Sequence, residues 1–187
     1  MLDVEAMSLY RYVPGREHLL DAVVERIIDE MREDPDVLDL PEHGWQDFLQ
    51  RLAHGVRRVA LAHPKAFPLV ASRPPEAPWL RPPLRSLTWV ETFLVGLNSE
   101  GFSDLAAVAA YRAFTSFLLG HLLLEVAALG ADVGPLDVVD DDLDKSLAPY
   151  PTVQRLHAPL REDHSAAEFE ESLENLLERL ALIKAEN

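Results

Sequence analysis

Apolar residues recur along most of this chain at steps of three and four, which is the spacing of one face of an α-helix. Prolines, glycines and capping residues divide this pattern into separate helices. Alternating apolar and polar positions, and the turns that would join strands, are missing. The pattern therefore predicts an all-α fold. The expected helices cover residues 5–13, 16–33, 45–63, 65–72, 84–100, 103–129 and 165–185, with one or two helical turns at 152–157.

Two of these helices have unusual patterns. The helix at 103–129, with Ser103 as its predicted N-cap and Gly130 after its end, is apolar nearly all round, which indicates a helix buried on most sides. The last helix carries a narrow heptad seam, typical of helix-on-helix packing. The seam consists of Phe169, Leu173, Leu176, Leu180 and Ile183.

The apolar stretch at 113–129 is the longest in the chain, but it is too short for a membrane span and contains His121 and Glu125. We interpret it as a buried helix, with no membrane partner. The first fifteen residues contain charges and lack the apolar core of a secretory signal. These features place the chain in the cytoplasm.

Composition narrows the possible functions. With 48% hydrophobic residues the chain can form a substantial core. The formal net charge of −15 argues against nucleic-acid binding by the chain as a whole, but not against a small DNA-reading element. The chain has no cysteine, which excludes disulfides, thiol catalysis and cysteine-ligated zinc.

Candidate catalytic chemistry is sparse. Nucleophile, phosphate-loop and metalloprotease motifs are absent, and the acidic positions between 132 and 144 lack the spacing of a calcium loop. His121 and Glu125 lie one helical turn apart, so they are either two ligands of an incomplete metal site or a buried hydrogen-bonded pair. We therefore expect no enzyme activity, no metal site and no cofactor.

The front of the chain has the strongest local pattern. A short helical segment ends at Pro14 and Gly15, and a long amphipathic helix follows. Such a short helix can lie in the DNA major groove, with Tyr10, Tyr12 and Arg16 reaching phosphates. The alternative is that its apolar residues only pack a helical corner.

This segment resembles the recognition helix and the following helix of the tetracycline-repressor (TetR) family. The similar residues are VEAMSLYRYVPGR at 4–16 and LLDA at 19–22. The resemblance continues in family order through WQDFL at 45–49, Arg73–Pro74, GFS at 101–103, Gly120, Tyr150–Pro151 and residues 168–177.

The resemblance implies a two-domain regulator that binds operator DNA as a homodimer and responds to a small-molecule inducer. Residues 1–33 would be part of the DNA-binding domain, and 34–187 the ligand-binding and dimerisation domain. The family's DNA contacts correspond to Ala6, Met7, Ser8, Tyr10, Tyr12 and Arg16. A four-helix bundle built from 103–129 and 165–185 would form the dimer. Its expected contacts are Leu122, Val126, Phe169, Leu173, Leu176, Leu180 and Ile183.

The family has two further helices before the recognition helix, and residue 1 falls at the turn between them and it. We therefore expect the helix-turn-helix of these 187 residues to be incomplete. Asp3 also stands where close relatives usually have glycine. A start codon placed too late, a shortened chain and a degenerate protein all remain open. The alternative function is a helical ligand-binding and dimerising protein that does not bind DNA.

The positions that bind drug and magnesium in the tetracycline repressor are not preserved. Leu52, Val56 and Leu69 occupy them, and a leucine does not ligate magnesium. We therefore expect a largely apolar pocket for an apolar or amphipathic inducer of unknown identity, with plain core packing as the alternative role for each residue. The expected lining residues are Phe67, Leu69, Trp89, Phe93, Phe117 and His121.

Overall fold

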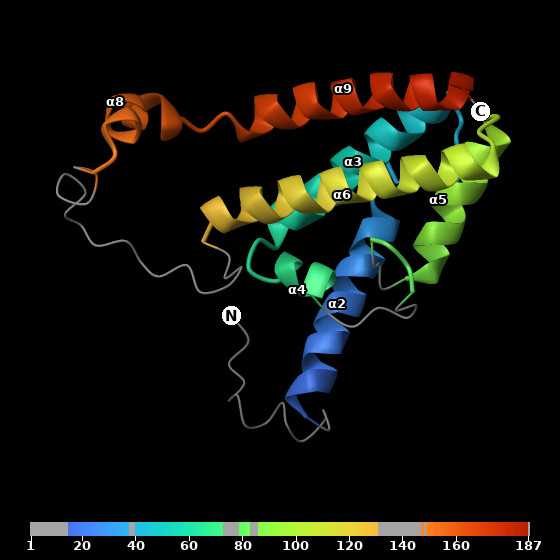
Figure 1. The fold of residues 1–187 in the computed structure, drawn as a ribbon. Coiled ribbons are helices and arrows are strands. Elements are labelled where there is room, and N and C mark those ends of the chain that lie inside the picture. Colours follow the sequence, from blue (N-terminus) through green and yellow to red (C-terminus); the bar gives the residue numbers. More distant parts are fainter. Residues whose placement is uncertain are drawn as a thin grey trace.

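A computed structural model describes residues 15–37, 40–72, 79–82, 86–130, 147 and 149–186. This part of the chain folds into α-helices joined by loops, without a β-strand, which confirms the all-α prediction (Figure 1). The helices are α2 (Arg16–Glu33), α3 (Trp45–Ala62), α4 (Phe67–Ser72), α5 (Leu87–Ser99), α6 (Asp104–Ala128), α8 (Pro151–Leu160) and α9 (Ser165–Glu186).

Local chemistry explains several helix ends. The Ser103 hydroxyl accepts a hydrogen bond from the Ala106 amide at 3.2 Å, so the predicted N-cap of α6 is confirmed. Gly101 and Gly130 follow the ends of α5 and α6 with φ of 85° and 82°, a conformation that favours glycine. Proline at the first position of α8 suits a helix start, and this helix is longer than the turn or two we predicted.

The start of α5 differs from the prediction. The helix begins at Leu87 rather than near residue 84. Two prolines at 82 and 83 favoured a helix start at that point, but the residue before a proline avoids the helical region. Ser86, in an extended conformation, is the residue that precedes the helix.

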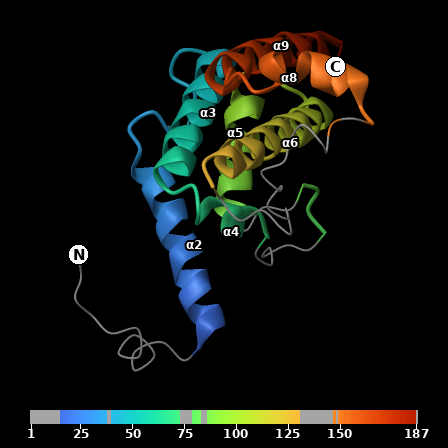
Figure 2. The same cartoon turned by 90° about the vertical axis from the view of Figure 1, so that its left-hand side faces the viewer.

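The core forms around α6, which packs against α3, α4, α5 and α9. Helices α6 and α9 lie side by side and run in opposite directions (Figures 1 and 2). Phe48, Phe67, Phe114 and Phe169 are the largest fully buried side chains. Among the described helices, α6 alone is long and apolar enough to cross a membrane, a test that the core helix of a globular domain also passes.

Two helices extend away from this core. The buried residues of α2 are Val24, Ile27 and Met31, which lie from the middle of the helix toward its C-terminal end, and its N-terminal part projects from the body (Figure 1). Helix α8 lies at the opposite end and has no buried residue.

Candidate ligand-binding cavity

An apolar cavity of about 100 Å³ lies among five helices. Helix α6 forms one wall, α3 and α4 form others, and α5 and α2 complete it. The lining residues are Ile28, Met31, Leu52, Val56, Phe67, Val70, Ser86, Trp89, Phe93, Tyr111, Phe114, Thr115, Leu118 and Leu119. Helix α2 precedes the other described helices in sequence and contributes two residues to the wall. The cavity therefore lies between α2 and the core.

Among the described residues, no charged side chain lines the cavity, and the polar groups there are three hydroxyls and the indole N–H of Trp89. The Tyr111 hydroxyl donates a hydrogen bond to the Pro82 carbonyl at 2.7 Å. Burial raises the pKa of Tyr111 to about 12, and a hydrogen bond with Thr115 opposes this shift. The Ser86 hydroxyl accepts a bond from Arg32 of α2 at 3.2 Å. A charged ligand would therefore find no counter-ion in the described part of the wall and would lose its hydration on entry.

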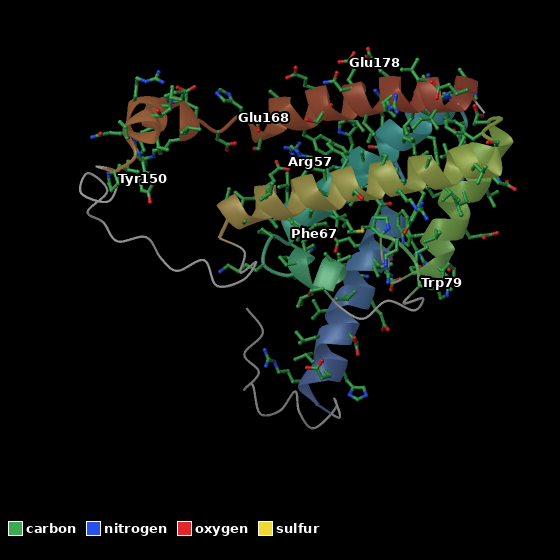
Figure 3. The ribbon with its side chains drawn as sticks, viewed as in Figure 1. Arg57, Phe67, Trp79, Tyr150, Glu168 and Glu178 are labelled. Carbon is green, nitrogen blue, oxygen red and sulfur yellow. The ribbon has the colours of Figure 1, made fainter. Side chains whose placement is uncertain are left out.

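Aromatic rings form one side of the cavity. The Phe93 ring lies 5.9 Å from Tyr111 and 5.5 Å from Phe114, measured between ring centroids. Trp89 lies one helical turn before Phe93 and is partly buried. Phe67 of α4, labelled in Figure 3, adds a further ring to the wall. These rings give a rigid apolar surface that suits an aromatic or alicyclic ligand.

Of the six predicted lining residues, Phe67, Trp89 and Phe93 reach the cavity, as do Leu52 and Val56. The other three require correction, because Leu69, Phe117 and His121 are not part of its wall. Phe117 and His121 lie on a different face of α6, with ring centroids 5.7 Å and 5.2 Å from Phe169 of α9. Because α6 is apolar on nearly all sides, its sequence does not show which face lines the cavity.

Sequence reasoning misses the contribution of α2. Ile28 and Met31 belong to an apolar stripe that the sequence assigns to the DNA-binding part of the chain. Spacing shows that a helix has an apolar face and does not show which element covers it. The sequence therefore does not show that α2 lies next to the pocket.

On another side of α6, a buried charged pair joins three helices. Arg57 of α3 donates two hydrogen bonds to the Glu125 carboxylate, at 3.0 Å and 2.5 Å, and these bonds raise the pKa of Arg57. Its guanidinium also lies 5.0 Å from the centre of the Phe169 ring, between α6 and α9 (Figure 3). Glu125 thus binds Arg57, and the predicted His121–Glu125 pair is not what the structure has.

Most of the predicted dimer contacts are already buried within the single chain. Leu122, Val126, Phe169, Leu173 and Leu180 are at most 1% exposed within the single chain. These five side chains pack within their own chain, where α9 lies against α6, and the role of the seven residues in a dimer stays a prediction. Leu176 and Ile183 are only partly buried. The exposed apolar residues of the α6–α9 layer are instead Leu105, Val108, Leu124 and Leu182.

The predicted DNA contacts at Ala6, Met7, Ser8, Tyr10 and Tyr12 lie outside the described residues. Arg16 is described; it is the first residue of α2 and is exposed. Its role at DNA stays a prediction. Within the described ranges, no group of three His, Asp or Glu side chains is placed to hold a metal ion.

In the described residues, these observations define an all-helical domain with an apolar cavity between its helices, an arrangement typical of a ligand-binding domain. The chain belongs to the family described as "Tetracyclin repressor-like, C-terminal domain", whose model matches residues 38–182. It is 29% identical over 119 residues to the HTH-type transcriptional repressor DrrR1 of Streptomyces coeruleorubidus. That match covers 64% of this chain and only 41% of the repressor.

Solved structures of the family have the same fold. A possible TetR family transcriptional regulator from Streptomyces coelicolor A3(2) is 28% identical with a TM-score of 0.67, covering 97% of this chain and 85% of that one. A single-residue variant of TetR from Acinetobacter baumannii AYE, in complex with minocycline, is 25% identical with a TM-score of 0.63. That match covers 98% of this chain and 80% of the variant.

Proposed function

We propose that this chain is a cytoplasmic transcriptional regulator, acting as a repressor, that binds DNA as a homodimer and releases it when a small neutral apolar ligand enters the cavity. The observation that carries the proposal is the shared wall: Ile28 and Met31 of α2 line a cavity otherwise built by the core. A ligand there presses on the helix that follows the predicted DNA contacts at Ala6, Met7, Ser8, Tyr10, Tyr12 and Arg16.

The size of the cavity supports this coupling. An apolar cavity of roughly 150 Å³ accommodates a molecule such as benzene. The present cavity is about 100 Å³, so a larger ligand must displace part of the wall. Helix α2 buries three of its 18 residues, against nine of 18 in α3, so α2 is the wall element that we expect to move.

The ligand-binding part of the proposal has a direct test. N-phenyl-1-naphthylamine is a neutral fluorescent probe, and 1-anilinonaphthalene-8-sulfonate is its anionic counterpart. We expect the neutral probe to bind at least about tenfold more tightly, because the described lining residues include no cation. Leu118→Trp fills the cavity and should weaken neutral-probe binding about tenfold or more, whereas Leu160→Trp on exposed α8 should not. Equal binding by both variants would contradict the cavity as the site.

The regulatory part is tested by selecting DNA from a random pool with the full-length protein. We expect a near-palindromic site whose halves lie about one helical turn apart. Leu124→Glu places a charge on the exposed α6 face and should give a monomer in light scattering and abolish selection of that site. Val95→Glu, on exposed α5, should change neither.

Selection of no sequence, together with an intact dimer and tight probe binding, would favour the alternative. In that case the chain is a helical ligand-binding and dimerising protein without DNA binding.

A further inference from the structure

The connection between α2 and α3 is held by an unusually dense set of polar contacts. The Asp34 carboxylate, just after α2, accepts two hydrogen bonds from Arg58 of α3 at 3.0 Å and 2.6 Å. Arg58 also binds Asp36 at 2.6 Å. Asp34 in turn accepts a bond from the Asp36 amide at 2.9 Å, and Arg51 donates to the Pro35 carbonyl at 3.2 Å. Residues 34–36, called the α2–α3 turn below, are thus fixed to one face of α3.

Gly55 allows this turn to lie close against α3. A Cβ atom added at Gly55 would lie 2.5 Å from Cγ2 of Val37 and 3.3 Å from a carboxylate oxygen of Asp34. The first distance is far below van der Waals contact, so any other residue at 55 would require the Val37 side chain or the turn itself to move. Glycine and Arg58 therefore act together, one by allowing the approach and the other by holding it.

This arrangement makes α2 a lever with one fixed end. The helix has 18 residues, so it is about 27 Å long. Ile28, which lines the cavity, lies about 9 Å from Asp34, and Arg16 lies about 27 Å away. A rotation about the fixed turn therefore moves Arg16 about three times as far as Ile28. If neither end of α2 is held, a displacement at Ile28 shifts the whole helix, and Arg16 moves no farther than Ile28 does.

We propose that Arg58, bound to Asp34 and Asp36 over Gly55, is the positioning residue that makes the α2–α3 turn the pivot of α2. This inference rests on the proposed function for its biological meaning, because it describes how displacement at the cavity reaches the N-terminal end of α2. The pivot itself is a property of the chain without ligand or DNA, and it is tested in their absence.

The test measures a distance between two spin labels. The chain has no cysteine, so His18→Cys on α2 and Glu178→Cys on α9 give two unique labelling sites on exposed positions. Labelled protein is diluted with unlabelled chain so that only distances within one copy contribute. We expect a narrow distance distribution for the labelled parent, and one about twofold wider in Arg58→Met, because the lever loses its fixed end.

Two further variants make the result specific. Arg58→Lys keeps the charge but loses the two-pronged bond, and its width should fall between parent and Arg58→Met. Gly55→Ala should shift the mean distance, because the turn moves while Arg58 still binds it. The control is Arg26→Met, which removes a pair with Glu33 at 3.9 Å whose side chains are 66% and 68% exposed, and it should change neither width nor mean.

If Arg58→Met lowers the urea midpoint but leaves the distance distribution as narrow as in the parent, Arg58 only stabilises the fold and the pivot is elsewhere. Failure of probe binding or DNA selection would not alter the distance distribution, so the proposed function and the pivot fail separately.

Discussion

Arg57 and Arg58 are neighbours in sequence and hold different parts of the molecule. Successive residues of a helix point about 100° apart, so Arg57 meets Glu125 of α6 while Arg58 meets Asp34 after α2. The Arg57 pair is enclosed, with side chains 18% and 6% exposed, whereas 49% of Arg58 is in solvent. Helix α3 therefore holds α6 through a buried charged pair and holds the end of α2 through a more exposed pair.

Breaking the buried pair should have the largest effect. Glu125→Gln leaves the Arg57 guanidinium without its carboxylate next to Phe169, and we expect a loss of about 3 kcal/mol in the free energy of unfolding. Urea unfolding measures this loss. The double variant Arg57→Met/Glu125→Leu should recover most of it, because no buried charge remains unpaired. If Glu125→Gln is as stable as the parent, water must replace the carboxylate as the partner of the Arg57 guanidinium.

The exposed pair should have a smaller, pH-dependent effect. The hydrogen bonds from Arg58 lower the pKa of Asp34 below its ordinary value of 3.8. A lowered pKa in the folded state contributes stability above the unfolded value, and this contribution is lost as pH falls through the folded value. We therefore expect Arg58→Met to cost about 1 kcal/mol at pH 6 and almost nothing well below the pKa of Asp34. Urea midpoints of parent and variant from pH 6 to pH 2.5 measure the difference. A constant difference across this range would contradict the assignment to Asp34.

Sequence reasoning succeeded where the information is local. The Ser103 cap and Gly130 lie at the ends of α6, and their chemistry acts within a few residues. The stripe of α2 and the proline after it predicted the ends of that helix. The family resemblance was confirmed across residues 38–182.

It failed where two faces of similar polarity had to be told apart. The seam of α9 is a sound packing surface, but a heptad pattern does not show whether its partner belongs to the same chain or a second copy. Phe169 and Leu173, predicted as dimer contacts, are already buried within their own chain. Likewise Phe117 and Phe114 are both aromatic residues of α6, and only the tertiary packing turns Phe114 to the cavity.

The close approach at Gly55 also determines the order in which substitutions at positions 37 and 55 are tolerated. A side chain at 55 collides first with Val37 and only then with Asp34. A lineage that replaces Val37 by a smaller residue opens space for alanine at 55, whereas the reverse order passes through a displaced turn. Past changes at one position of the turn therefore decide which changes at the other are tolerated.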